Sequence, residues 1–197
     1  MPLSPEQIAG CWRQEYEKAP ATLARMSEIN TLAAAFNANV DSVVKISGAE
    51  LQRRIRQTGM TLAELKNDAD RSIRRPEDVL RGIFRCFTLG IAEEWIAQDK
   101  EIYRWMKKEL GTEKLQMGAQ AGIIANTMSL TGIGRVVTHV GALPELQARQ
   151  FFKRDNLLSF DQNGTLKPAH TVNRPNEEAS IHWIIEFDKD DRLEAEG

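Results

Sequence analysis

Apolar residues near the N-terminus recur at the spacing of one helix face. Residues 4–7, Ser-Pro-Glu-Gln, have the form of a capping box with proline at the first helical position. Ile8, Trp12 and Tyr16 then follow at intervals of four. This pattern predicts an amphipathic helix that begins at about residue 5.

The middle third of the chain has an almost entirely helical pattern. Residues 47–50 form a second capping box. One helix is expected to begin at Pro76 and end at Gly90, and another to be capped by Asp99 and end at Gly111. These signals predict a helical segment inserted between two regions that contain strands.

Short apolar runs elsewhere have the length and composition of strands. A buried strand is expected at 32–36 and a second run at 43–46. After Gly111 strands alternate with helices, and Asn163-Gly164 has the form of a hairpin turn. This alternation predicts an α/β fold with a largely parallel sheet and a hairpin-bearing insertion that forms a second lobe. The later strands are expected at 115–117, 135–140, 157–160 and 181–187, with helices after Gly118 and from Pro144.

Composition places the chain among ordinary globular proteins. Of the 197 residues 42% are hydrophobic and 27% charged, and the net charge is -2. Such a weak, mixed charge disfavours a nucleic-acid or anionic membrane partner. No run of about 18 apolar residues and no signal-peptide pattern occurs, so a cytoplasmic location is expected. The two cysteines form no C-x-x-C pair, and no metal site is expected.

Polar side chains follow the first expected strand. Asn37, Asn39 and Asp41 come directly after the apolar run and could bind the vicinal hydroxyls of a sugar. The alternative is an Asx turn that satisfies only its own backbone. A small-residue turn, Gly118-Ala119-Gln120-Ala121-Gly122, lies between a strand and a helix, where ligands bind in open α/β sheets. A tight turn without a ligand is the alternative there.

Three further polar residues are candidates on weaker grounds. Glu93 and Glu94 follow Gly90, although charged helix faces are usually only solvated. Alternation along 181–187 puts His182 on the strand face opposite Trp183, where a structural histidine is the alternative to a ligand. No phosphate-binding G-x-x-x-x-G-K-[ST] loop and no G-x-G-x-x-G motif occurs, which excludes Walker-type nucleotide enzymes.

Together these segments resemble the ADP-dependent glucokinase and phosphofructokinase family. The matching pieces occur in the family's order and at about its spacing, over residues from about 30 to 190. They are AAAFNANVD, GIAEEW, MGAQAGIIAN, RVVTHVGALPELQARQF, FDQNGTLKPAH and IHWIIEF.

The resemblance implies a fold and a set of sugar-binding residues. The fold is a ribokinase-like three-layer αβα sheet, here incomplete, with a small β-containing lid lobe from about 42–60 and 161–186. The implied ligands of a hexose or hexose phosphate, with glucose favoured and dual specificity open, are Asn39, Asp41, Glu94, Gly118, Ala119, Gln120 and His182. Glu93 is the alternative to Glu94, and Ala119 departs from the family, which has glycine there.

The resemblance also implies what this chain lacks. The family's G-x-G-D catalytic aspartate, nucleotide loops and Mg²⁺-coordinating acid lie toward the C-terminus of longer chains, and Gly132-Ile133-Gly134 is followed here by Arg135. We therefore assign no catalytic or metal-binding residue, and expect ADP and Mg²⁺ to be used only with a C-terminal part or partner chain. A hexose kinase in truncated or split form is the first hypothesis, and a non-catalytic sugar-binding module or decayed fragment the alternative.

Overall fold

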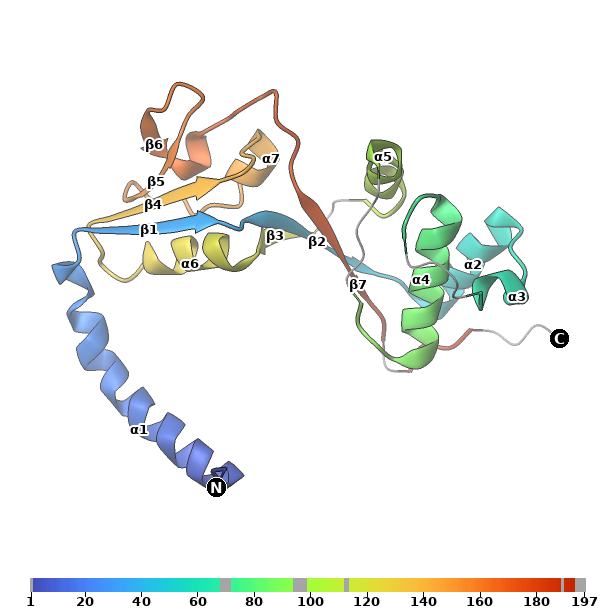
Figure 1. The fold of residues 1–197 in the computed structure, drawn as a ribbon, viewed down its shortest axis with the longest axis horizontal. Helices are drawn as coiled ribbons and strands as arrows, with labels where there is room; N and C mark the ends of the chain where they lie inside the picture. Colours follow the sequence, from blue (N-terminus) through green and yellow to red (C-terminus); the bar gives the residue numbers. More distant parts are fainter. Residues whose placement is uncertain (1, 68–71, 94–98, 112–113, 189, 194–197) are drawn as a thin grey trace. The chain divides into compact units, whose positions relative to one another are not determined.

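The chain divides into two compact units in a computed structural model that describes residues 2–67, 72–93, 99–111, 114–188 and 190–193 (Figure 1). The first unit comprises residues 1–40 and 117–181, and the second comprises residues 41–116 and 182–197. The chain therefore passes from the first unit to the second and back before it ends in the second.

The first unit contains a four-stranded sheet. Its strands are β1 (Thr31–Phe36), β4 (Arg135–Val140), β5 (Leu157–Phe160) and β6 (Leu166–Pro168), hydrogen-bonded in the order β1-β4-β5-β6. β1 pairs in parallel with β4 and β4 with β5, whereas β6 is antiparallel to β5. The prediction of an α/β fold with a largely parallel sheet is confirmed.

The turn between β5 and β6 is the predicted hairpin. Gly164 has a φ of 75°, which glycine adopts without steric cost. Asp161 closes the turn, because its Oδ1 accepts hydrogen bonds from the backbone amides of Asn163 (2.8 Å) and Thr165 (3.0 Å). The Lys167 ammonium lies 2.7 Å from the other carboxylate oxygen of Asp161.

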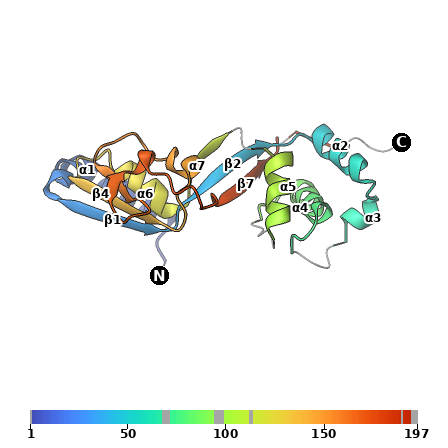
Figure 2. The ribbon, with the colours of Figure 1, turned by 90° about the horizontal axis from the view of Figure 1, so that it is seen from above.

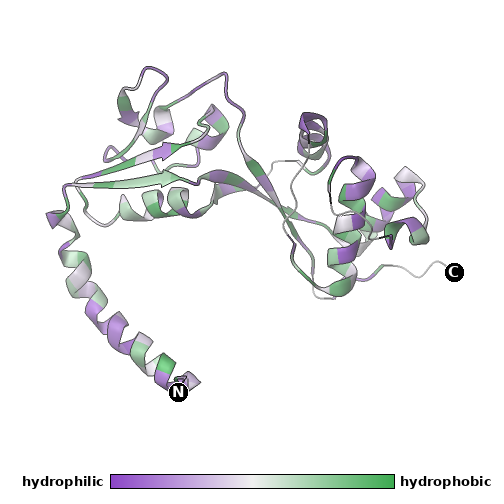
Figure 3. Ribbon diagram, in the orientation of Figure 1, coloured by the Kyte–Doolittle hydropathy of each residue, from purple (hydrophilic) through white to green (hydrophobic). Residues whose placement is uncertain are grey.

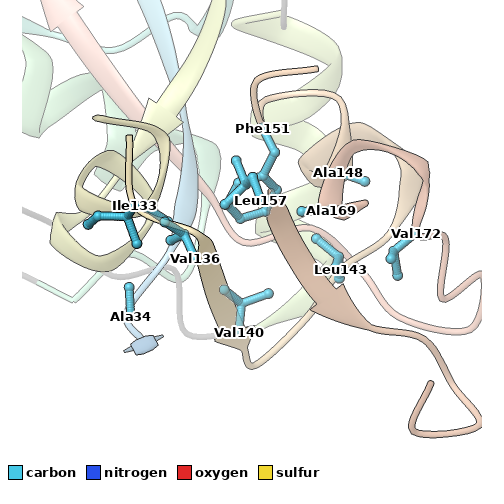
Figure 4. Packing of buried hydrophobic residues seen from close by; sticks show 11 residues of the cluster. Ala34, Ile133, Val136, Val140, Leu143, Ala148, Phe151, Leu157, Ala169 and Val172 are labelled. Carbon is cyan, nitrogen blue, oxygen red and sulfur yellow. The ribbon is translucent and has the colours of Figure 1, made fainter. Parts of the chain in front are cut away.

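One face of this sheet carries the core of the first unit. Helix α6 (Gln120–Met128) packs against β1 and β4, and α7 (Glu145–Ala148) and the short helix η2 (Ala169–Thr171) contribute further side chains. Figure 4 shows these side chains meeting around the buried Val136 and Leu157. The other members are Ala34, Ala125, Ile133, Val140, Leu143, Ala148, Phe151, Ala169 and Val172.

The expectation of a buried strand at 32–36 is wrong for most of β1. Only Ala34 is buried. Leu32 is half-buried, and Thr31, Ala33, Ala35 and Phe36 are exposed. The reason is that the face of the sheet opposite α6 is not covered by any described element. We call this surface the open face; by strand alternation and pairing register it consists of Ala33, Ala35, Val137, His139, Leu158 and Phe160.

The predicted N-terminal helix is confirmed as α1 (Pro5–Ala24). Ser4 and Gln7 make the expected capping box, with Pro5 at the first helical position. α1 is followed by a short 3₁₀ helix, η1 (Met26–Glu28), before β1 begins. Hydrophobic and hydrophilic stretches alternate along α1 in Figure 3, yet none of its residues is buried.

A second, three-stranded sheet has the order β3-β2-β7. β3 spans Leu115–Gly118, β2 spans Asn39–Lys45 and β7 spans Ile181–Glu186. The expected alternation along β7 is confirmed, because Trp183, Ile185 and Phe187 pack against the core of the second unit. β2 begins at Asn39, so the polar cluster belongs partly to a strand and only residues 37–38 form the turn.

The helices of the second unit are α2 (Gly48–Thr58), α3 (Leu62–Leu65), α4 (Pro76–Leu89) and α5 (Lys100–Glu109), seen from above in Figure 2. The predicted start of α2 and the predicted starts and ends of α4 and α5 are confirmed, whereas α3 was not predicted. Gly90 ends α4 with a φ of 63°, and the Asp99 carboxylate accepts hydrogen bonds from two amides of α5 at 2.9 Å. Buried side chains of this unit include Ile46, Leu51, Ile73, Val79, Ile83, Ile102, Met106 and Leu110.

The predicted lid lobe combines segments that belong to different units of the structure. Residues 42–60 lie in the second unit, while 161–181 lie in the first and contribute β6 to its sheet. A lid lobe formed by 42–60 and 161–186 stays a prediction. Within the described ranges, no helix combines the length and the apolar character needed to cross a bilayer.

Candidate functional site

Two of the turns singled out in the sequence are hydrogen-bonded to each other within the first unit. The turn at 37–38 joins β1 to β2, and Ala119 joins β3, which ends at Gly118, to α6. The backbone amide of Ala121 donates a hydrogen bond to the carbonyl oxygen of Asn37 at 2.9 Å. Sequence segments about 80 residues apart are thus brought together at the carboxyl ends of β1 and β3, where α/β proteins bind ligands.

Close packing between these two turns explains why residue 122 is a glycine. A Cβ atom on Gly122 would overlap the sulfur of Met117 and lie 3.2 Å from the Cβ of Ala38. The absence of a side chain at Gly122 therefore permits the contact between the two turns.

The backbone of Ala119 has a conformation that normally requires glycine. Its φ is 57° and its ψ is 160°. A Cβ atom is strained in this region, and non-glycine residues there are concentrated at functional sites and turns. Gly118 beside it is buried, while Gln120, the first residue of α6, exposes its side chain. The turn therefore presents Gln120 to solvent directly next to a strained residue.

Asn39 is held beside these turns by the strand that it begins. Only 3% of the residue is exposed, and it lies next to the fully buried Val40, whose amide donates to the carbonyl oxygen of Ser180 at 2.8 Å. An asparagine fixed in this way has an amide of defined position at the start of β2. Such a group can both donate to and accept from a hydroxyl.

No local pattern selects Gln147, yet this residue supports the same turn. Its side chain is fully buried, and its Nε2 donates a hydrogen bond to the carbonyl oxygen of Ala38 at 2.9 Å. Among the residues that the structure describes, its Oε1 has no hydrogen-bond partner. A single glutamine in a four-residue helix carries no sequence signal, because its role depends on a contact 109 residues away.

Two predicted ligands belong to the second unit. Asp41 is half-buried on β2, two residues after Asn39, and His182 is exposed on β7. The neighbouring Trp183 faces the other way and donates a hydrogen bond from Nε1 to the carbonyl oxygen of Gly111 at 3.1 Å. The structure therefore places Asn39 in the same unit as Gly118, Ala119 and Gln120, and places Asp41 and His182 in the other unit.

The acidic pair is only partly described. Glu94 lies outside the described residues. Glu93, its alternative, forms an ion pair with Arg85 in which both side chains are largely buried. Burial raises the pKa of the neighbouring Cys86 thiol, and the Glu93 carboxylate adds to this effect.

No metal site can be assigned in the described part of the chain. It contains no group of three His, Cys, Asp or Glu side chains placed to hold an ion. A surface hollow of about 300 Å³ lies along one face of α2 and is lined by Ala49, Gln52, Arg53, Arg56 and Gln57. None of the predicted site residues lines it. The described residues thus do not fit a Mg²⁺ site.

Comparison with models of protein families assigns the chain to one of them. Residues 30–196 match the model of the ADP-specific phosphofructokinase/glucokinase conserved region. The chain belongs to this family. The resemblance drawn from its sequence segments is therefore confirmed.

Individual members of the family agree with this assignment. The chain is 32% identical over 158 residues to an ADP-specific phosphofructokinase of Pyrococcus abyssi, covering 79% of the chain and 35% of the relative. It is 30% identical over 179 residues to an ADP-dependent glucose/glucosamine kinase of the same organism, covering 89% and 38%. The chain thus spans little more than a third of the length of these relatives.

A solved structure confirms the fold class. The last common ancestor of ADP-dependent phosphofructokinases from Methanosarcinales superposes with a TM-score of 0.70 at 27% identity, covering 91% of the chain and 38% of that structure. The chain therefore has the mixed α/β architecture of the ribokinase-like ADP-dependent kinases.

Proposed function

We propose that this chain forms the sugar-binding part of an ADP-dependent hexose kinase. One observation carries the proposal: the turn that precedes Asn39 accepts a hydrogen bond from the amide of Ala121, the residue after Gln120 in the first turn of α6, in a chain of a sugar-kinase family. Two polar side chains thereby flank one junction at the carboxyl ends of the strands. Amide groups of this kind suit the paired donors and acceptors of a sugar.

The proposed reaction transfers the β-phosphoryl group of ADP to a hexose hydroxyl. A bond forms between the sugar oxygen and the β-phosphorus, the bond to the bridging oxygen breaks, and AMP leaves. In a complete kinase ADP would supply the phosphoryl group and Mg²⁺ would neutralise its charge, but no described residue of this chain is assigned to hold either of them. This chain's residues hold the sugar hydroxyl in place, and such positioning supplies several kcal/mol of the rate enhancement, on the order of 7–11 kcal/mol at best. The base that takes the hydroxyl proton is assigned to no residue here.

Glucose is the favoured sugar, with fructose 6-phosphate as the competing substrate. The proposal rests on Glu94, which resembles the glucose-binding carboxylate of the glucokinase branch. Relatives named as phosphofructokinase and as glucose/glucosamine kinase match the chain at almost equal identity. The proposal therefore includes the possibility that the chain accepts both glucose and fructose 6-phosphate.

Calorimetric titration of the full chain with glucose and with fructose 6-phosphate tests the sugar site. Gln120→Ala should weaken binding by about fivefold, because one hydrogen bond contributes about 1 kcal/mol. Gln162→Ala, which changes an exposed glutamine in the hairpin turn, is the matched control and should leave the dissociation constant within a factor of two. Absence of binding by either sugar, in a chain shown by circular dichroism to be folded, would refute the proposal.

A non-catalytic sugar-binding module is the second candidate function. A coupled assay with glucose, ADP and Mg²⁺ separates the two functions. Sugar binding without turnover supports the module, whereas turnover by the chain supports the kinase.

A further inference from the structure

The loop after β4 lies at the same edge of the sheet as the candidate sugar site. β4 pairs in parallel with β1, and the last residues of the two strands, Val140 and Phe36, are partners in the register. Residues 141–144 and the turn at 37–38 therefore leave the sheet at its carboxyl edge, where α/β proteins bind ligands. A group that fixes this loop can act on the turn that leads to Asn39.

An ion pair from a later segment holds the loop. The backbone amide of Leu143 donates a hydrogen bond to Oε2 of Glu177 at 2.6 Å. The same oxygen lies 3.0 Å from Nε of Arg174, whose Nη2 donates to the carbonyl oxygen of Val140 at 2.9 Å. The backbone amide of Arg174 also donates to the carbonyl oxygen of Leu143 at 2.9 Å. The end of β4 and the middle of the loop are thus tied to residues 174–177.

These contacts are largely shielded from water. The side chains of Arg174 and Glu177 are 15% and 31% exposed, and Leu143 is fully buried. A hydrogen bond from an amide to a carboxylate is stronger than one between neutral groups. Removal of the Glu177 carboxylate would leave a buried amide without its acceptor, so the loop would have to shift to find another.

The loop also places the side chain that reaches the sugar-site turn. The carbonyl oxygen of Pro144, at the end of the loop, accepts hydrogen bonds from the amides of Gln147 and Ala148 at 3.0 Å. Gln147 in turn donates from Nε2 to the carbonyl oxygen of Ala38. A helix of four residues has no stability of its own, so the position of Gln147 depends on the loop that precedes it.

We propose that Glu177 and Arg174 are positioning residues for the sugar site. They act through the loop after β4 and Gln147 on the turn that precedes Asn39. Their role rests on the proposed function, since only a sugar bound beside this turn gives the ion pair an effect on affinity. By fixing where Gln147 meets Ala38, the ion pair holds the turn in one position, and the sugar binds without first ordering it.

Calorimetric titration with glucose and hydrogen exchange of single amides, both in the full chain, test this role. Glu177→Ala removes the acceptor of the Leu143 amide, and Glu178→Ala, which removes the same charge from the exposed next residue, is the matched control. Glu177→Ala should raise the dissociation constant for glucose about fivefold. It should also raise the exchange rate of the Ala121 amide, which donates to the turn at Asn37, by about tenfold. The control should leave both quantities within a factor of about two.

A double-variant cycle distinguishes positioning from general stabilisation. Gln147→Met keeps the approximate size of the side chain and removes its hydrogen bond to Ala38. Because Glu177 acts through Gln147, the double variant should bind glucose no more than about twofold more weakly than Gln147→Met alone. Losses of affinity that multiply mean that the two residues act independently, and they overturn the proposal. If circular dichroism shows Glu177→Ala to be unfolded, Glu177→Gln takes its place, with Glu178→Gln as its control.

The two readouts fail separately. Absence of sugar binding in every chain, the unaltered one included, refutes the proposed function, and the exchange rate of the Ala121 amide then decides alone whether the ion pair positions the turn. An unchanged exchange rate in a folded Glu177→Ala chain overturns the proposal even where glucose binds. Equal changes in Glu177→Ala and Glu178→Ala overturn it as well, because they mean that charge and not the contact with the loop is responsible.

Discussion

Replacing Ala119 with glycine should stabilise the first unit. Ala119 has φ 57° and ψ 160°, and it is the one non-glycine residue with positive φ in the described part of the chain. Hydrogen bonds from the first turn of α6 hold this conformation, since Ala121 donates to the Asn37 carbonyl and the amide of Ile123 donates to the Ala119 carbonyl at 3.2 Å. Glycine adopts the same backbone without a Cβ clash.

Two opposing terms set the size of this effect. A non-glycine residue in this region is strained by about 1–3 kcal/mol. Glycine gives back about 0.5–1 kcal/mol, because it loses more conformational freedom on folding than alanine. The free energy of unfolding should therefore rise by about 1 kcal/mol, and the melting temperature by about 2–4 °C for a chain of this length.

Urea unfolding followed by circular dichroism measures the change, and hydrogen exchange of the α6 amides assigns it to the first unit. Ala121→Gly is the matched control, because Ala121 is buried and helical and lies two residues away. That variant loses about 0.5–1 kcal/mol from the backbone and about 0.8 kcal/mol from the lost methyl group. The two substitutions should thus change stability in opposite directions.

The reasoning fails if Ala119→Gly destabilises the chain as much as Ala121→Gly does. That result would mean that Ala119 is relaxed in the folded protein and that the glycine of related turns has another role. Hexose binding provides a second readout, because removing the methyl group at Ala119 widens the approach to the turn. The dissociation constant for the sugar should stay equal or fall.

Two further predictions concern the hairpin and the start of α2. The Lys167 ammonium and two turn amides lower the pKa of Asp161 to about 2, so the stabilisation that the ionised carboxylate gives the hairpin should be complete above about pH 4 and lost as the pH falls through about 2. An NMR titration of the carboxyl should show this value and a higher one in Lys167→Ala; a wild-type value near 4 would contradict the assignment. Gly48→Ala should lower the free energy of unfolding by about 1–3 kcal/mol, because the new Cβ would overlap the backbone carbonyl of Arg192. Gly10→Ala, in α1 with nothing near its added Cβ, should raise it by about 0.5–1 kcal/mol, and a loss of equal size in both variants would exclude the overlap as the cause.

Local signals predicted the helix ends because the interactions that fix them lie within a few residues. The capping box at Ser4, the cap at Asp99 and the glycine stop at Gly90 all form as the sequence indicates. Each depends on hydrogen bonds or backbone conformations that span no more than one helical turn. The hairpin turn before Gly164 was predictable for the same reason.

The burial of β1 and the role of Gln147 could not be predicted in this way. An apolar strand is buried only if other elements cover both of its faces, and here one face of the sheet is open. Gln147 matters because its amide reaches Ala38, 109 residues earlier in the chain. Neither property is encoded in the neighbouring residues, so periodicity and composition carry no trace of them.

In the candidate site, the atoms that hold the two turns in place differ from the atoms that would bind a sugar. The carbonyl oxygens of Asn37 and Ala38 accept the hydrogen bonds that hold the two turns in place. The donors are a backbone amide and the buried Gln147, which do not face solvent. The exposed side chain of Gln120 takes no part in these contacts, and a substitution there should change ligand binding while leaving the scaffold intact. A change at Gln147 should instead disturb the turn itself, and its effect on sugar binding should accompany a loss of stability.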